Sequence, residues 1–357
     1  MRKRLFLCVV LFLVSTTLIT GNAVGQIVYV DVNNGSGNED GLSWATAYTD
    51  IQTAINSAPQ QAEIWVAAGV YTYFMGLAVV EINNEYHLYG GFNGTETARE
   101  ERDPNINFTY IDGEFGFPCV KINAPCTLDG FHINNGYGSA ENGAGVAVTV
   151  TGATIANCTF FNNETMTNGG ALYIEYADCT VRNCIFKNNR AANGAAIYHS
   201  NAVKAFGATL TAINCVFVDN IASNSGVIFN EYVFTDFLHC TFYNNQAYAG
   251  SLFQFLFEGQ LAIKNSIITD HPMPLISTGH SAVITVDYSR TGEFFAGTGN
   301  TQADPMLVDP WNGNFSLLWD SPCKDVAPVD PRALTDITGL DRPQGDLADM
   351  GAYELIQ

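Results

Sequence analysis

The sequence predicts an all-β fold: a right-handed single-stranded parallel β-helix with three strands in each coil, an N-terminal helical cap and an irregular C-terminal cap. The first observation behind this prediction is a seven-residue word built around Cys-x-Phe and ending in Asn-Asn or Asp-Asn. Its four copies occupy residues 157–163, 183–189, 214–220 and 239–245, with their cysteines 26, 31 and 25 residues apart. A period in this range indicates one structural unit stacked on copies of itself.

The second observation is a word led by glycine or another small residue, which falls between successive cysteine words. Its copies occupy residues 143–147, 169–173, 194–198, 225–229 and 249–253. A third apolar stretch precedes each cysteine. Each period therefore holds three segments of about four to six residues, rich in β-branched and aromatic types, which glycine and asparagine interrupt too often for helices.

The residue before each cysteine is expected to form a sharp corner between two strands. Asparagine and histidine suit this place because they are enriched among non-glycine residues with positive φ. Stacked asparagine amides can also hydrogen-bond along such a column. The corner positions are Asn157, Asn183, Asn214 and His239, followed by Asn265 in a weaker fifth copy.

Two inner columns follow from the same word, because residues two apart on a strand point the same way. The cysteine column consists of Cys158, Cys184, Cys215 and Cys240, and the phenylalanine column consists of Phe160, Phe186, Phe217 and Phe242. We predict that the four cysteines are buried and reduced, because free cysteine packs as a small hydrophobe and a disulfide needs a specific geometry.

The remaining cysteines of the exported chain leave their pairing open. Cys119 and Cys126 flank Pro125 and are the better candidates for a disulfide in an oxidising compartment. Cys179 and Cys323 have no evident partner in the sequence.

The N-terminus has the features of a cleaved signal peptide. Basic residues at positions 2–4 precede an apolar run to about residue 18, and small residues end at Gly25. An uncleaved membrane anchor is the alternative, although the run is short for a span of ~20 residues. We predict a secreted or cell-surface monomer with no transmembrane span after cleavage. Its expected parts are a signal peptide (1–25), an N-terminal cap with the first coils (26–115), the β-helix repeats (116–300) and a closing segment (301–357).

Both ends of a β-helix need a cap, because open strand edges invite pairing with other chains. Thr49 to Gln52 reads as a capping box that opens a short helix, with Ile51, Ala54 and Ile55 on its apolar face. We expect this helix to close the N-terminal end. The irregular stretch from about 301 to 354 is expected to close the other end.

The chain is strongly acidic, with a net charge of −20. Nucleic acid is excluded as a partner on electrostatic grounds, and a polyanionic glycan would be repelled. Calcium is the one cofactor considered. The loop from Asp31 to Asp40 is rich in oxygen ligands but lacks the EF-hand spacing, so an acidic turn is the alternative interpretation. Asp304 and other C-terminal aspartates raise calcium binding more diffusely, and no metal ligand is assigned.

Several words resemble those of bacterial exported β-helix repeat proteins. The Gly-Gly-Ala and Phe-x-x-Asn words are similar to those of polymorphic outer-membrane proteins, and segments 304–310 and 342–354 resemble a closing segment of the choice-of-anchor type. The resemblance extends through residues 29–71 and 90–104 and so covers nearly the whole mature chain. It implies the pectin-lyase-like fold and a place at the cell surface, in adhesion or carbohydrate binding without catalysis.

An enzyme is the alternative function, because the β-helix family includes pectate lyases and polygalacturonases. A polysaccharide lyase or glycoside hydrolase would here need a non-standard site, since basic residues do not recur at one coil position. Glu175 and Glu231 share a coil position two coils apart, roughly 10 Å by strand spacing, with Ser200 between them. Solvated surface glutamates are the alternative interpretation, and no catalytic residue is assigned.

The predicted carbohydrate-binding site is a stripe of aromatic side chains on the glycine-led strand. If the aliphatic column of Leu172, Ile197, Ile228 and Leu252 faces the interior, the next residue of each strand faces outward. The predicted stripe consists of Tyr173, Tyr198, Phe229 and Phe253, with Glu175 and Glu231 two residues further along their strands. Exposed rings would form a platform for sugar rings while the carboxylates bind hydroxyls.

The opposite register is the alternative, with the aromatics inside. The residues facing water would then be Ile174, His199, Asn230 and Gln254. A further criterion separates the two functions: a groove lined by aromatics and amides favours binding, whereas clustered Asp, Lys or Arg in a groove favour an enzyme.

Overall fold

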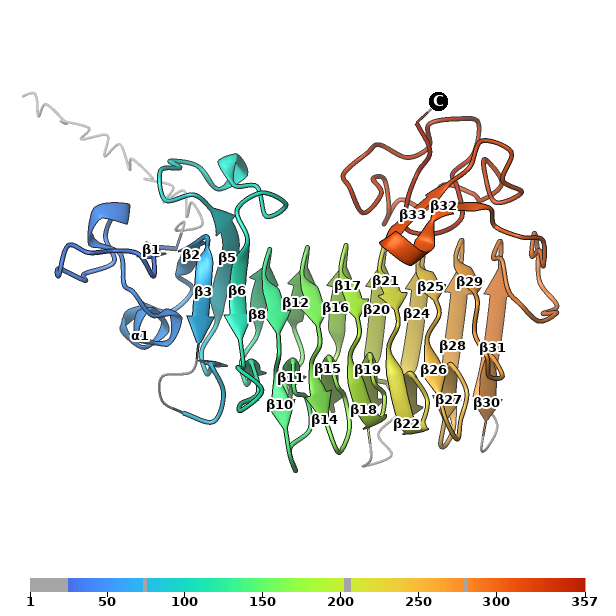
Figure 1. Cartoon of the computed structure of the whole chain (residues 1–357), viewed down its shortest axis with the longest axis horizontal. Coiled ribbons are helices and arrows are strands. Elements are labelled where there is room, and N and C mark those ends of the chain that lie inside the picture. Colours follow the sequence, from blue (N-terminus) through green and yellow to red (C-terminus); the bar gives the residue numbers. More distant parts are fainter. Residues whose placement is uncertain (1–24, 73–75, 202–206, 279–281, 357) are drawn as a thin grey trace, which may run out of the picture.

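The chain winds into a right-handed parallel β-helix, with α1 at one end and an irregular C-terminal segment beside the later coils (Figure 1). This computed structural model describes residues 25–72, 76–201, 207–278 and 282–356. The predicted signal peptide lies almost wholly outside the described residues. Within them, no helix has both the length and the apolar character needed to cross a bilayer.

Three long parallel sheets run the length of the helix, named A, B and C in the order in which each coil visits them. Sheet A contains β1 (Ile27–Val30), β2 (Glu63–Ala67), β5 (Tyr86–Phe92), β8 (Cys126–Asp129), β12 (Ala153–Ala156), β16 (Cys179–Arg182), β20 (Thr209–Ile213), β24 (Phe234–Leu238), β28 (Gly259–Lys264) and β31 (Ala282–Asp287). Sheet B contains β3 (Gly69–Thr72), β6 (Thr109–Asp112), β9 (His132–Asn134), β13 (Thr159–Phe161), β17 (Ile185–Lys187), β21 (Val216–Val218), β25 (Thr241–Tyr243) and β29 (Ile267–Thr269). Sheet C contains β4 (Val80–Ile82), β7 (Val120–Ile122), β11 (Val146–Val148), β15 (Leu172–Glu175), β19 (Ile197–Ser200), β23 (Ile228–Glu231), β27 (Phe253–Phe255) and β30 (Ile276–Thr278).

A fourth sheet of short strands, sheet D, lies on the connection from sheet B to sheet C, and the sequence pattern did not reveal it. Its strands are β10 (Tyr137–Gly138), β14 (Glu164–Thr165), β18 (Arg190–Asn193), β22 (Ile221–Ser225) and β26 (Gln246–Ala247). Outside the four sheets, β32 (Leu307–Asp309) pairs antiparallel with β33 (Asn314–Leu317). The 3-10 helices are η1 (Trp44–Thr46), η2 (Arg99–Glu101) and η3 (Pro310–Asn312).

The corner between sheets A and B has the conformation that the sequence predicts. All five corner residues, from Asn157 to Asn265, have φ between 50° and 53°. Their amides also pair along the stack, since Asn183 Nδ2 donates to Asn157 Oδ1 at 3.1 Å and Asn214 Nδ2 donates to Asn183 Oδ1 at 3.1 Å. The column of left-handed corners therefore fixes both the turn and its register from coil to coil.

The core is filled by the predicted columns. The four repeat cysteines belong to the main hydrophobic cluster. The rings of Phe160, Phe186, Phe217 and Phe242 stack with centroid separations of 4.6, 4.8 and 4.5 Å and interplanar angles below 10°. Ile268 continues this column in the next coil, opposite Phe242. All eight cysteines among the described residues are free and buried, so Cys119 and Cys126 are not joined.

A second, fully buried column consists of asparagines at the end of each cysteine word. Asn163, Asn189, Asn220 and Asn245 all have no exposed surface. Each of the first three donates from Nδ2 to the Oδ1 of the next, at 2.8 to 3.0 Å. Each also donates to a backbone carbonyl of the preceding coil, as from Asn220 to the carbonyl of Phe186 at 2.8 Å. We call this column the inner asparagine ladder.

The N-terminal end is closed by α1 (Ile51–Ser57), as predicted, although its cap differs from the prediction. The N-cap is Asp50, whose carboxylate accepts from Thr53 N at 2.7 Å, so the capping box from Thr49 is wrong. Asp50 takes this place because aspartate accepts well from the first-turn amides. Ile51, Ala54 and Ile55 pack into the core.

The C-terminal segment is irregular, as predicted, but it packs on the flank of the helix rather than across its end. Its backbone carbonyls accept from corner amides, including Asn214 to the carbonyl of Thr335 at 2.7 Å and Asn265 to that of Pro328 at 2.9 Å. Phe315 and Ala352 cover Val216 and Val218 on the outer face of sheet B. At the end itself, Phe295 packs against the core.

Replacing Asn220 by alanine should lower the free energy of unfolding by about 3 kcal/mol, because four hydrogen bonds are lost and buried partners remain unsatisfied. Denaturant unfolding measures the change. The control is Asn224→Ala, which removes an exposed amide that donates to Asn193 Oδ1, and we expect a change near 0.5 kcal/mol or less. Equal losses in the two variants would contradict a special role for the inner ladder.

All eight described cysteines should react with a thiol reagent only after unfolding. Burial raises the pKa of Cys126 and of Cys323 to about 12, and it raises the pKa of Cys119 and Cys179 further. Mass spectrometry after alkylation of native and of unreduced denatured protein measures this. Eight modified thiols in the denatured sample are expected; two or more blocked cysteines would reveal a disulfide.

Candidate functional site

The predicted aromatic residues of sheet C form a stack outside the main core. Tyr173 and Tyr198 have ring centroids 5.4 Å apart, and Tyr198 and Phe229 have centroids 4.7 Å apart with an interplanar angle of 4°. Together with Ala147 they form a cluster separate from the core. The register places the three rings opposite one another on β15, β19 and β23. The outward direction of these three side chains is therefore as predicted.

The rings are nevertheless covered, so the prediction of an exposed stripe is wrong. Tyr173, Tyr198 and Phe229 are 7, 9 and 6% exposed. Glycine turns lie over the two tyrosines: a β-carbon added at Gly169 or at Gly194 would come within 2.7 Å of Cβ of Tyr173 or of Tyr198, respectively. Both glycines have positive φ, 71° and 62°. In these two coils, the glycine that leads the word thus covers the tyrosine that ends it.

Phe253 is a second correction, because it points into the core. It pairs with Ile228 rather than with Phe229, and it has no exposed surface. Gln254 occupies the aromatic position of that coil instead. The cause is a one-residue shift: Ser251 stands where Gly226 stands in the previous coil, and a slip of one residue exchanges the two faces of a strand.

The alternative register is also wrong for the first three coils. Ile174, His199 and Asn230 are completely buried. His199 Nε2 lies 3.2 Å from the carbonyl oxygen of Ala177, and Asn230 Oδ1 accepts from Thr235 Oγ1 at 2.8 Å. In β15, β19 and β23, the residues on both sides of the aromatic position thus point inward, and the aromatic ring points outward but is covered.

The two predicted glutamates lie at one coil position, as expected. Glu175 pairs with Ser200, which pairs with Glu231. Glu231 Oε2 accepts from Ser200 Oγ at 2.8 Å and from Tyr198 OH at 3.4 Å. Burial raises the pKa of Tyr173 and Tyr198, and the charges of Glu175 and Glu231 raise it further. Both carboxylates are half-buried and act here as partners of the covered stack.

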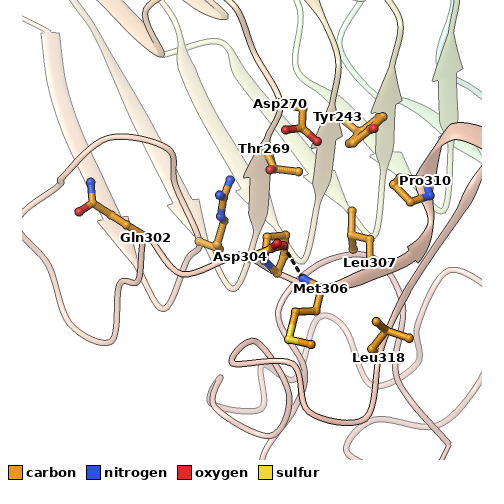
Figure 2. A pocket seen from close by; sticks show the side chains of 11 residues that line it. Tyr243, Thr269, Asp270, Gln302, Asp304, Met306, Leu307, Pro310 and Leu318 are labelled. Carbon is orange, nitrogen blue, oxygen red and sulfur yellow. Dashed lines mark hydrogen bonds between the residues drawn. The ribbon is translucent and has the colours of Figure 1, made fainter.

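A cleft of about 600 Å³ lies where the last coils meet the C-terminal segment (Figure 2). Its floor comes from sheet B through Tyr243 and Thr269, with Asp270 at the following corner. Arg290 follows β31, and the opposite wall comes from residues 302–307 with Pro310 and Leu318. A smaller cavity of about 300 Å³ shares Thr269, Asp270 and Arg290 on its other side.

The polar groups of this cleft carry both signs of charge. Arg290 is fixed at its base, with Nε donating to the carbonyl of Ala303 at 3.0 Å and Nη1 to that of Ile268 at 2.7 Å. Burial lowers the pKa of Arg290, against the attraction of Asp270 and Asp304. The ion pairs found among the described residues do not join Arg290 to either aspartate.

Aromatic surface borders the cleft. Trp311 follows the lining residue Pro310, is 74% exposed, and places its ring edge-on at 5.6 Å from the ring of Tyr243. Burial raises the pKa of Tyr243, and Asp270 and Asp219 add to the shift. Apart from Asp304, the residues of this cleft have no distinguishing signal in the sequence: the repeat accounts for Tyr243 and Asp270 by position, and no motif marks Arg290.

A separate groove of about 350 Å³ crosses the outer face of sheet B on the other side of the C-terminal segment. Its lining consists of Pro104, Asn105, Phe108, His132, Asn157, Cys158, Thr159, Asn183, Ile185, Ile337, Thr338 and Gly339. Aromatic, amide, hydroxyl and aliphatic side chains therefore dominate it. A groove lined by aromatics and amides is the arrangement expected for a binding protein rather than for an enzyme.

The acidic loop considered for calcium is organised by its own backbone. Asp31 accepts from Asn33 N at 2.9 Å, and Asp40 accepts from Leu42 N at 3.0 Å. Across the described part of the chain, no group of three or more His, Cys, Asp or Glu residues is arranged to hold a metal ion. Calcium binding stays a prediction.

The stacked parallel sheets define a right-handed parallel β-helix protein. In agreement, residues 119–290 match the family model described as the right handed beta helix region. No curated protein matches the chain in sequence.

Two solved structures illustrate what the chain is similar to. Pectate lyase Pel9A is 15% identical, with a TM-score of 0.38, and the match covers 92% of this chain and 96% of that chain. The pectin methylesterase from Aspergillus niger, in its penultimately deglycosylated form, is 15% identical, with a TM-score of 0.36 and coverage of 77% and 85%.

Replacing Tyr198 by alanine should destabilise the protein by about 3 kcal/mol, because it removes the middle ring of a covered stack. Thermal or denaturant unfolding measures the change. Tyr248→Ala is the matched control, since that tyrosine is 65% exposed, and we expect a change within about 0.5 kcal/mol. An unchanged stability for Tyr198→Ala would show that the ring is a free surface after all.

Proposed function

We propose that the protein binds a neutral carbohydrate in the cleft between its last coils and its C-terminal segment, without cleaving it. The observation that carries this proposal is a single cavity lined by a guanidinium, carboxylates and an amide, with an exposed tryptophan at its rim. It would act as an exported protein at a bacterial cell surface, in adhesion or glycan capture.

The polar lining supports a ligand rich in hydroxyl groups. A sugar hydroxyl both donates and accepts hydrogen bonds. Asp270 and Asp304 supply acceptors, while Arg290 and Gln302 supply donors. Asp304 Oδ1 already accepts from Met306 N at 2.9 Å (Figure 2), so its position is fixed while its second oxygen has no partner among the described contacts. Adjacent hydroxyls of one sugar ring could bridge such a set.

The aromatic rim supports a ring-shaped ligand. Trp311 is 74% exposed and offers an aromatic face beside Tyr243, which lines the cavity together with Leu307 and Leu318. Exposed aromatic faces next to convergent polar groups are typical of specific small-molecule sites. A sugar ring has this combination of an apolar face and a polar edge.

The charge of the chain supports a neutral ligand. With a net charge of −20, the protein would repel a polyanionic glycan at a distance. Two carboxylates against one guanidinium give the cleft the same sign. The placement at the cell surface is supported by the resemblance of segments 304–310 and 342–354 to a choice-of-anchor closing segment.

A polysaccharide lyase or glycoside hydrolase is the second candidate, because clustered Asp and Arg side chains in a groove favour an enzyme and this cleft holds two carboxylates and a guanidinium. Asp270 and Asp304 would then act as acid and base. A glycan-array binding screen beside assays for reducing sugars and unsaturated products separates the two candidates. Reproducible turnover of a bound glycan would replace binding by catalysis.

Asp304→Asn and Trp311→Ala should each weaken binding of the glycan selected on the array by about tenfold or more, as expected for one charged hydrogen bond or one stacking face. Asp304→Asn retains an acceptor for Met306 N, and Trp311 is mostly exposed, so both variants should fold normally. Isothermal titration calorimetry measures affinity, and unfolding measures integrity.

Tyr248→Ala is the control for removal of an exposed aromatic ring that does not line the cleft, and the affinity of this variant should equal that of the unmodified protein. Unchanged affinity in both cleft variants, with binding still present, would place the carbohydrate site elsewhere on the molecule.

A further inference from the structure

The groove on sheet B is a second site, built by three separate parts of the chain. One wall comes from the segment that carries Asn105 and Phe108, and the opposite wall comes from residues 337–339 of the C-terminal segment. The floor comes from β9, β13 and β17 through His132, Thr159 and Ile185, which follow one another in register. The floor is thus a regular sheet surface between two irregular walls.

One edge of the groove is the outer column of corner asparagines. Asn157 Nδ2 donates to Asp129 Oδ1 at 2.9 Å, and its Oδ1 accepts from Asn183 Nδ2. Asn183 Oδ1 accepts in turn from Asn214 Nδ2. An asparagine amide carries two N–H donors and two lone pairs. Within the contacts of the described residues, this outer column uses one of each and leaves one N–H and one lone pair on both Asn157 and Asn183.

The centre of the groove is apolar. Ile185 is half-buried on the outer face of β17 and Phe108 is 43% exposed. The ring of Phe108 meets that of His132 edge-on at 5.0 Å, which holds both rings against the floor. Ile337 faces them from the opposite wall. An apolar patch thus lines the same groove as the amides of Asn157 and Asn183.

We propose that this groove binds the acetamido group of an N-acetylated sugar, an inference that rests on the proposed carbohydrate binding for its ligand class. The methyl group packs against Ile185 and Phe108. The amide N–H and carbonyl oxygen pair with the free lone pair and the free N–H of Asn157 and Asn183. A plain hydroxyl at the same position of the sugar offers no methyl group and leaves the apolar centre unfilled.

The lining of the groove agrees with a neutral acetamido ligand. Its twelve residues are uncharged apart from the histidine, in contrast to the cleft at Arg290. The C-terminal segment separates the two places, since Phe315 and Ala352 cover β21 between them. The groove and the cleft are therefore distinct sites on one face, with different preferences.

The test uses tri-N-acetylchitotriose and cellotriose, two neutral trimers that differ in an acetamido or a hydroxyl group on each ring. Calorimetry on the unmodified protein should give two chitotriose sites and one cellotriose site. The acetyl methyl signals should receive the strongest saturation transfer in NMR. A single chitotriose site that survives removal of the groove groups would overturn the inference.

The groove variant is Asn157→Gly combined with Ile185→Thr. Glycine tolerates the φ of 50° at position 157, and threonine stands at the equivalent position of β13, so folding should be retained. Chitotriose should fall to one site while cellotriose is unaffected. The control is Asn188→Gly with Val283→Thr, which removes an amide at φ 58° and an exposed β-branched side chain outside the groove; it should behave as the unmodified protein.

The two proposals fail in different ways. Asp304→Asn should weaken the site shared by both trimers and spare the one specific to chitotriose. If chitotriose still binds at its specific site but no site is shared by both trimers, only the proposal of carbohydrate binding in the cleft is refuted. Equal binding of both trimers in the groove would refute the acetamido preference alone.

Discussion

The inner asparagine ladder is the constraint on which the coils depend. A β-helix must turn sharply in every coil, and each turn leaves backbone groups that the sheets do not pair. Asn163, Asn189 and Asn220 solve this inside the protein, since each Nδ2 donates to a carbonyl of the preceding coil and to the next Oδ1. Their Oδ1 atoms accept backbone N–H groups in return, and those of Asn189 and Asn220 also accept the Nδ2 group of the preceding asparagine. Each buried amide thus makes hydrogen bonds with both its N–H groups and with its oxygen, and burial of polar groups is tolerated under this condition.

The ladder also sets where the C-terminal segment can dock. With the coils held in register, the outer face of sheet B is a flat surface of Val216, Val218 and Tyr243 that Phe315 covers. A buried ion pair organises the segment: Arg342 Nε lies 3.3 Å from Glu354 Oε2, and both side chains are fully inaccessible. Burial lowers the pKa of Arg342 and raises that of Glu354, so each charge depends on the other. Buried pairs of this kind fix a geometry more surely than they add stability.

The sequence could predict the coils because their determinants are local and repeated. The positive φ at Asn157 and its equivalents, the cysteine column and the phenylalanine stack all follow from one seven-residue word. The direction of a side chain could not be predicted where one additional or missing residue moves it to the opposite face of its strand. Phe253 ends a glycine-led word as Tyr173, Tyr198 and Phe229 do, yet the one-residue shift at Ser251 turns it into the core. Nothing local in the sequence distinguishes the two registers.

The same reasoning explains why the candidate sites could not be found from the repeat. Tyr173 and Tyr198 do point outward, but the glycine turns of their own word cover them, and only the three-dimensional path of the turn reveals this. The cleft and the groove instead form where an irregular segment meets a regular sheet. Arg290, Asp304 and Leu318 line one cavity with Tyr243 because residues 291–318 return to the last coils. Asn105 and Ile337 line one groove over β13 and β17, although more than two hundred residues separate them. In this protein the repeats supply rigid floors, and the segments that break the repeat supply the walls and the chemical differences between the sites.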